Sequence, residues 1–352
     1  MPEMTPRERW LALFAGQQAD RVPVDFWSTG EVLTRLKKEL QCPTDEALWR
    51  KLHIDRPRFL SPKWKLPHHP DDPQGNLWGV RHSTIEYGTG SYGEAVHHPL
   101  AKMETVAEVE AYRWPSPDDF DYTPVRAGVA QDDGYRLLKG GDYEPFLLYC
   151  AMRGMEQAFE DLLLNPEIAH AILRHLFEFY YEQNTRILEA GQGKIGLFYL
   201  AEDLAGQTGP LFSVDLYRRF LRPNQKKMAD LAKSYGAHVF YHTDGAARDF
   251  IPDLLDVVGI ELLNPLQWRC PGMEREGLVR DFDKRVVFHG GIDNQQTLPF
   301  GTRADLVQEV RECVGLFKGA RWICAPCHNI QPVTPTENIL AMYETIWEVG
   351  GR

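Results

Sequence analysis

The feature that most constrains the fold is a regular alternation of short apolar segments with longer amphipathic segments. Most of the short segments have the length and composition of buried strands, and the segments after them follow a helical period. This order implies parallel strands, because each helix returns the chain to the start of the sheet. The predicted strands are residues 22–26, 54–60, 135–138, 195–200, 237–241, 259–263, 286–288 and 321–324. Eight strands fit either a (β/α)8 TIM barrel or an open doubly wound sheet.

Polar residues at the ends of nearly all these strands favour the barrel. An open sheet concentrates its functional groups at one switch point, whereas a barrel presents them around its C-terminal rim. The strand ends supply Asp25, Asp142, Glu202, Asp203, His242, Asp244, Asn264, His289, Asp293, Cys327, His328 and Asn329. We therefore predict an α/β fold of the (β/α)8 TIM barrel type, as a single domain over residues 1–352, with its active site at this rim.

Two regions depart from the alternation. Near the N-terminus, Thr5-Pro6-Arg7-Glu8 has the cap, proline and first-turn acid of a helix start, and segments 31–40 and 44–52 are also helical in pattern. Residues 62–117 are rich in Pro, Asp, Gly and His, with extended pieces at 77–86 and 92–98. We predict N-terminal helices and a β-hairpin insertion over the C-terminal rim, where loops commonly shape a pocket.

Composition excludes several classes of protein. The net charge of −11 and the lack of a Lys/Arg run argue against a nucleic-acid partner. Six cysteines are too sparse for a disulfide scaffold. The first residues do not resemble a signal peptide, and no apolar stretch reaches the roughly 18 residues of a membrane span. These observations predict a cytoplasmic enzyme that acts on a small molecule.

The segment His242-Thr243-Asp244-Gly245 follows a buried strand and offers an imidazole and a carboxylate two residues apart. A catalytic zinc site has three protein ligands and one open position, and zinc accepts His, Cys and carboxylate ligands. Cys327 is the natural third ligand, with Glu202 as an oxygen alternative. The other interpretation is that His242 and Asp244 bond only to each other and to a substrate.

Several segments, in this order, resemble the uroporphyrinogen decarboxylase superfamily over nearly the whole chain. They are Asp20 to Val24, Arg153 to Glu156, Glu202 to Leu204, His242 to Gly245, Gly290 to Asp293, Thr297 to Thr302 and His328 to Pro332. The resemblance implies a distorted (β/α)8 barrel with a deep cleft at the C-terminal rim. One branch of this superfamily decarboxylates uroporphyrinogen without a cofactor. The other branch is zinc-dependent and moves methyl groups to or from a corrinoid protein, thiols or methoxylated compounds.

The residues at the cleft separate the two branches. The decarboxylase branch carries an Arg-Gln-Ala-Gly-Arg run where this chain has Phe26 to Glu31, with no arginine. An anionic tetrapyrrole needs such cationic partners to leave water. Pro62 stands where the decarboxylase branch has a pyrrole-binding Asp. The active-site Tyr of that branch corresponds to a position near Ala151 in this chain. The methyl-transfer branch has a His-x-Cys pair and a distant Cys, for which this chain offers His242, Asp244 and Cys327.

We therefore expect zinc-dependent methyl transfer or demethylation, with the methyl group passing to the cobalt of a separate corrinoid protein docked over the rim. The expected metal ligands are His242, Asp244 and Cys327. The expected catalytic residues are His328, Glu202 and Asp203, with proton transfer through His328 or Glu202. The expected substrate-binding residues are Asp25, Asp142, Asp293, Asn264 and Asn329.

Two alternatives stay open. In uroporphyrinogen III decarboxylation, His328 would position a substrate carboxylate, and Asp293 or Asp203 would bind pyrrole N–H groups. A barrel without enzymatic activity would carry a tetrapyrrole or a corrinoid. The resemblance to the decarboxylase branch also implies a homodimer.

Overall fold

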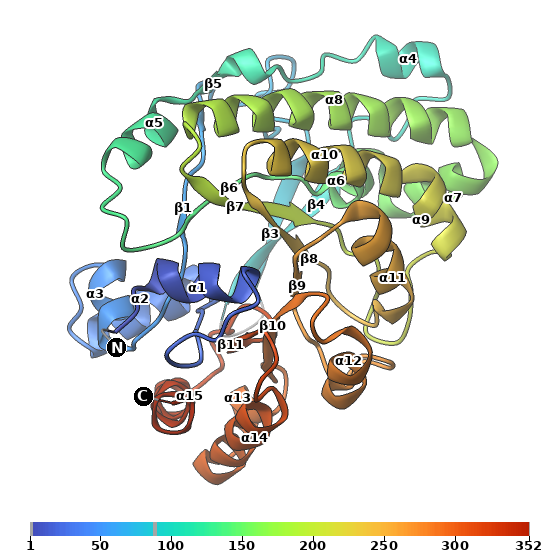
Figure 1. Ribbon diagram of the computed structural model, residues 1–352. Coiled ribbons are helices and arrows are strands. Elements are labelled where there is room, and N and C mark those ends of the chain that lie inside the picture. The colour runs from blue at the N-terminus through green and yellow to red at the C-terminus, as the bar shows by residue number, and fades with distance from the viewer. Residues whose placement is uncertain (1–2, 87–89, 352) are drawn as a thin grey trace.

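The computed structural model describes residues 3–86 and 90–351. Within these ranges, seven parallel strands form one curled sheet in which each strand pairs with the next along the chain. In sheet order they are β1 (Arg58–Phe59), β6 (Leu138–Gly140), β7 (Ile195–Ala201), β8 (His238–His242), β9 (Leu262–Asn264), β10 (Val287–Ile292) and β11 (Trp322–Pro326). Helices surround the sheet, with α8 and α10 on one side and α14 and α15 on another (Figure 1).

The predicted first strand, residues 22–26, closes the barrel between β11 and the chain that enters β1. Val24 forms a parallel bridge to Cys324. On the other side, the Asp55 N–H donates to the Val24 carbonyl at 2.7 Å. The bridge does not extend into a regular strand because Pro23 has no N–H and the Val24 N–H donates to the Asp55 carboxylate instead. The predicted (β/α)8 barrel is confirmed, with its first member reduced to this bridge.

The helices fill the connections between strands, as the alternation predicts. In the described part of the chain, no helix is both long and apolar enough to cross a membrane. They are α1 (Pro6–Phe14), α2 (Gly30–Glu39), α3 (Asp45–Lys51), α4 (Val106–Glu110), α5 (Thr123–Ala130), α6 (Pro145–Arg153), α7 (Met155–Leu164), α8 (Pro166–Ala190), α9 (Val214–Phe220), α10 (Arg222–Ser234), α11 (Ile251–Asp253), α12 (Arg275–Phe282), α13 (Thr297–Phe300), α14 (Arg303–Leu316) and α15 (Thr336–Val349), with short turns η1 (Pro117–Asp119), η2 (Arg248–Phe250) and η3 (Leu254–Val258).

The region 62–117 contains an antiparallel hairpin of β3 (Arg81–Glu86) and β4 (Ser91–His97). The residues between these strands, 87–89, lie outside the described part of the chain. A second small pair joins β2 (Lys63–Trp64) to β5 (Phe120–Asp121). The hairpin lines one cavity together with residues that follow β6, so it lies beside the rim.

The interior of the barrel is apolar toward the N-terminal ends of the strands, and α1 closes that end. Thr5 and Glu8 form a capping box at the start of this helix, as the sequence predicts. Trp10 and Leu13 of α1 pack against six inward-facing residues, each of which lies on a different strand or directly before it. These are Leu137, Leu197, Phe240, Leu262, Val287 and Ile323.

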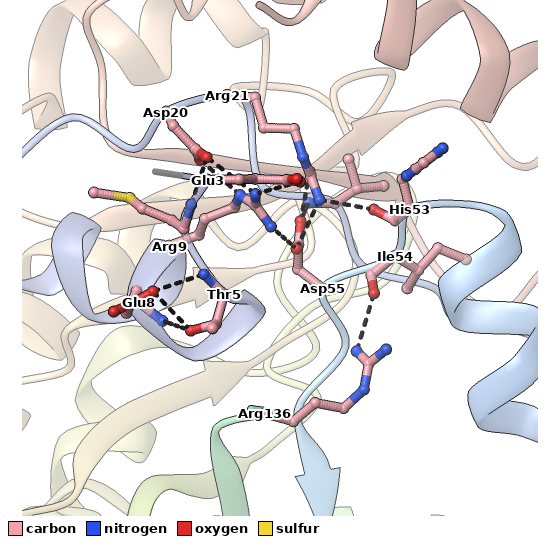
Figure 2. A network of polar contacts seen from close by, with 12 residues as sticks. Glu3, Thr5, Glu8, Arg9, Asp20, Arg21, His53, Ile54, Asp55 and Arg136 are labelled. Atoms are coloured by element: carbon pink, nitrogen blue, oxygen red, sulfur yellow. Dashed lines mark hydrogen bonds and ion pairs between the residues drawn. The ribbon is translucent and has the colours of Figure 1, made fainter. Parts of the chain in front are cut away.

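A buried charge network attaches α1 and the closing segment to the barrel (Figure 2). Arg9 donates to Asp55 at 2.9 Å and to Asp20 at 2.7 Å. Arg21 donates to both oxygens of Asp55, at 2.7 and 2.9 Å. Because Asp55 is fully buried and lies just before β1, this network is at the N-terminal end of the barrel.

Candidate functional site

The barrel interior becomes polar one layer above the apolar residues. Residues two apart in a strand point to the same face, so the position after each inward apolar residue also faces inward. Moving two residues on from Leu137, Leu197, Phe240, Leu262 and Val287 gives Lys139, Tyr199, His242, Asn264 and His289. This second layer lies toward the C-terminal ends of the strands, the end where barrel enzymes carry their active sites.

Three side chains at or just beyond the ends of β8 and β11 converge here. His242, Asp244 and His328 each present one ligand atom, and these atoms lie within 4.8 Å of one another. His242 Nε2 is 3.8 Å from Asp244 Oδ1, and His328 Nε2 is 3.4 Å from Asp244 Oδ2. His242 is buried, whereas the His328 side chain is about one third exposed. The cluster is therefore held from inside the barrel and reachable from outside.

The Asp244 carboxylate is incompletely satisfied. Its Oδ1 atom is buried and has no hydrogen-bond partner among the described residues. Burial raises the pKa of Asp244 to about 6, against the lowering effect of His242. Burial also lowers the pKa of His242 and of His328, so both imidazoles are neutral near pH 7. Neutral imidazoles and an unpartnered carboxylate oxygen are the groups a metal ion requires.

A directional chain of hydrogen bonds fixes the tautomer of His242. His289 Nε2–H donates to the Asp25 carboxylate at 3.0 Å, which leaves His289 Nδ1 as an acceptor for the Asn264 amide at 2.7 Å. The Asn264 oxygen then accepts from His242 Nδ1–H at 2.6 Å. Because the chain starts at a carboxylate that can only accept, each following donor is determined. His242 Nε2, which lies 3.8 Å from Asp244 Oδ1, is left with a free lone pair.

Further carboxylates surround the cluster. Asp203 accepts from the Asp244 backbone N–H at 3.1 Å, and Glu202 accepts from the N–H groups of Phe146 and Leu147 at the start of α6. Burial and the charge of Asp203 raise the pKa of Glu144 to about 8. Burial raises the pKa of Glu202 as well. The rim therefore holds more acid groups than nearby cations, and Glu144 carries a proton at neutral pH.

The other predicted site residues take varied positions. The structure does not bring Cys327 into the cluster: its thiol donates to the Leu266 carbonyl at 2.9 Å, and His328 takes the third place. Asp293 caps α13 by accepting from the N–H of Thr297, and it also pairs with Arg269. Asp25 and Asn329 line a cavity within the barrel. Asp142 lines a separate cavity at the rim, and Asn264 belongs to the hydrogen-bond chain.

That rim cavity measures about 700 Å³ and lies between the β3–β4 hairpin and α6. Its polar lining includes His82, Glu94, His98, Asp142 and Glu144. The size lies within the range of small-molecule sites. The rim cavity and the cluster also interact electrostatically, because the charge of Asp244 contributes to the raised pKa of Glu144.

Sequence reasoning missed Glu144 and Lys139. Glu144 lies two residues beyond the predicted Asp142, in a loop whose path the sequence does not give. Lys139 lies within a strand, where a charged residue at a position that alternates with Leu137 signals an inward-facing polar layer. That signal was available in the sequence.

Comparisons with known proteins agree with this architecture. The chain is 25% identical to uroporphyrinogen decarboxylase of Prochlorococcus marinus over 182 residues, which cover 51% of this chain and 48% of that protein. It is 26% identical to the enzyme of the same name from Parasynechococcus marenigrum over 182 residues, covering 51% of this chain and 47% of that protein. The chain thus spans about half the length of these relatives.

Among solved structures, a methyltransferase from Methanosarcina mazei superimposes with a TM-score of 0.71 at 19% identity, covering 98% of this chain and 99% of that one. At this identity the likeness shows a shared fold. The family model described as uroporphyrinogen decarboxylase (URO-D) matches residues 86–349, about three quarters of the chain. The chain therefore belongs to the uroporphyrinogen decarboxylase family.

Proposed function

We propose that the protein is a metal-dependent methyltransferase or demethylase that takes a methyl group from a small methylated substrate. The acceptor in this proposal is the cobalt of a separate corrinoid protein that docks over the rim. The observation that carries the proposal is the convergence of His242, Asp244 and His328, with Asp244 Oδ1 buried and unpartnered. The fold shared with the Methanosarcina mazei methyltransferase is compatible with it.

Zinc fits the donor set. Two neutral imidazoles and one carboxylate match a catalytic zinc site with three protein ligands and an open position. Asn264 is the hydrogen-bond partner that such a His ligand usually has on its second nitrogen. When bound, zinc would supply Lewis acidity toward the oxygen or sulfur of the substrate.

The chain's own residues would handle binding and the proton. Glu144 lines the rim cavity and holds a proton at neutral pH, so its carboxyl group would protonate the oxygen or sulfur left when the methyl group departs. The Asp203 carboxylate would hold Asp244 in place by accepting a hydrogen bond from the Asp244 backbone N–H. Since Glu202 caps α6, its part in this proposal is to position the loop that carries Glu144.

Cofactor-free decarboxylation of uroporphyrinogen is the second candidate, because the curated relatives carry that name. Two features weigh against it. Residues Phe26 to Glu31 contain no arginine, and the rim carries the acids Asp142, Glu144, Asp203 and Asp244. A substrate with many carboxylates would be repelled by these groups. Incubation with uroporphyrinogen, scored for coproporphyrinogen, separates the two candidates.

The direct test is methyl transfer to reduced cobalamin from a panel of methoxylated compounds and methylated thiols, followed by the absorbance of methylcobalamin. We expect product with wild-type protein and a loss of at least 100-fold in His242→Ala. The matched control is His238→Ala, at the opposite end of β8, where His238 pairs with Glu261. Equal rates in wild type and His242→Ala would reject the proposal. The cytoplasmic location and the homodimer stay predictions.

A further inference from the structure

A second cavity, of about 280 Å³, lies inside the barrel below the cluster. Its lining combines cationic groups, one carboxylate and aromatic rings. Those that matter here are Lys139, Arg56, Asp25, Trp27, Tyr199 and Phe240. Trp27 and Tyr199 also contact the His242 ring, with centroid distances of 5.6 and 6.1 Å, so the cavity and the metal cluster share a wall.

Lys139 enters this cavity without a hydrogen-bonding acceptor. Its Nζ lies over the rings of Phe240, Tyr199 and Trp27, at 4.1, 4.3 and 5.3 Å from their centroids. Among the described residues, this ammonium group makes no hydrogen bond or ion pair. Aromatic faces stabilise a cation by a fraction of what an anionic partner gives. The ammonium group therefore keeps all three of its donors for a ligand or for water.

The one carboxylate nearby is already engaged. Asp25 accepts from the Phe26 N–H at 2.7 Å, from the Trp27 indole at 3.0 Å and from His289 at 3.0 Å. Arg56 Nη1 lies 3.6 Å from Asp25 Oδ1, beyond hydrogen-bonding distance. That nitrogen is buried and has no hydrogen-bond partner among the described residues. Two cationic side chains thus line the cavity beside one carboxylate that already accepts three hydrogen bonds, so a second anionic group would balance the charge.

We infer that this cavity binds a single-ring aromatic carboxylate, with its carboxylate on Lys139 and Arg56 and its ring against Trp27, Tyr199 and Phe240. Arginine and lysine are the usual partners of a carboxylate. Aromatic walls pack a planar ring, and the volume lies near the lower limit for ligand sites, so a tetrapyrrole does not fit. The inference is independent of the proposed methyl transfer, because binding needs neither a metal nor a methyl acceptor.

The protonation of Lys139 supports this assignment. Burial lowers its pKa to about 7, and the charge of Arg56 lowers it while that of Asp25 raises it. Tyr199 on the neighbouring strand β7 and His289 on β10 are the other titratable groups near it. A bound carboxylate stabilises the ammonium form, so affinity is highest below pH 7 and falls as the pH rises through the pKa of Lys139.

Titration calorimetry with benzoate at pH 6.5 tests the inference, with benzyl alcohol as the uncharged analogue and acetate as the analogue without a ring. We expect benzoate to bind at least tenfold more tightly than either analogue. Lys139→Met should weaken benzoate binding at least tenfold, whereas Lys194→Met, at an exposed lysine just before β7, should not change it. Equal binding of benzoate by Lys139→Met and wild type would overturn the inference, as would no benzoate binding by wild type.

Two further variants keep the result interpretable. Benzoate bound at the metal cluster instead would be lost in His242→Ala, whereas binding at Lys139 persists in that variant. If Lys139→Met does not fold, Arg56→Gln serves in its place, since this side chain is about one third exposed. Unchanged benzoate affinity in folded Arg56→Gln, together with affinity that does not fall between pH 6 and 9, would also reject the assignment.

Discussion

The barrel holds a buried polar cluster at each end, and the two differ in how fully their groups are paired. At the N-terminal end, Arg9 and Arg21 donate five hydrogen bonds to Asp55 and Asp20 (Figure 2). At the C-terminal end, Asp244 keeps an unpartnered oxygen beside two neutral imidazoles. Buried polar groups that find partners hold a fold together, whereas those left without partners indicate a ligand.

The largest effect is expected at the paired end. Asp55→Ala removes the carboxylate that two buried guanidinium groups share, so we expect it to lower the free energy of unfolding by about 3–5 kcal/mol. Urea denaturation measures this change. Asp230→Ala, which removes an exposed ion pair with Lys226, is the control and should cost less than about 1 kcal/mol. A similar small cost for Asp55→Ala would mean that the network is not structural.

The next effect is expected at the unpaired end. Asp244→Asn should lower metal affinity by at least about 100-fold, because a ligand contributes more than the 10–100-fold typical of its supporting residues. Stability of the metal-free protein should change by less than about 1 kcal/mol, since Asp244 Oδ1 has no partner to lose. Competition with a chromophoric chelator gives the affinity. Strong destabilisation without loss of metal affinity would reverse the contrast between the two ends.

Asn264 offers a smaller test of the same cluster. Asn264→Ala frees the His242 ring and its tautomer, and we expect a 10–100-fold loss of metal affinity. Asn264→Asp keeps the oxygen that accepts from His242 Nδ1 and should retain more affinity than the alanine variant. If the two variants behave alike, the hydrogen-bond chain does not orient His242.

The smallest effect concerns pH. Glu144 and Asp244 have folded-state pKa values raised to about 8 and about 6, so the folded protein binds more protons than the unfolded chain above pH 4. Stability of the metal-free protein should therefore fall as the pH rises from 4 to 8. Each unit of pKa shift corresponds to up to about 1.4 kcal/mol of stability. Because both groups contact solvent in the cavity, we expect a total loss of about 1 kcal/mol between pH 4 and 8. Urea titrations of Glu144→Gln/Asp244→Asn should show a flatter profile, and an unchanged slope would contradict the assignment.

The sequence predicted the architecture better than it predicted the site. Alternating apolar and amphipathic segments indicate the barrel, and the strand ends indicate the residues that gather at its rim. The sequence predicted Cys327 as the third member of the cluster, with Glu202 as the alternative, and His328 only for a role in proton transfer. The structure puts His328 in that place instead, because adjacent residues beyond a strand point in different directions. Here the thiol turns to the Leu266 carbonyl. Nor does the sequence give the path of the loop that brings Glu144 toward Asp244.

The central claim is that His242, Asp244 and His328 share one metal ion. Anomalous diffraction measured on both sides of the zinc absorption edge, on crystals of the protein purified with zinc, tests it most directly. We predict one peak per chain within bonding distance of all three side chains, absent from crystals of Asp244→Asn. A peak elsewhere, or a zinc-free cluster in crystals of protein that binds zinc in solution, would contradict it.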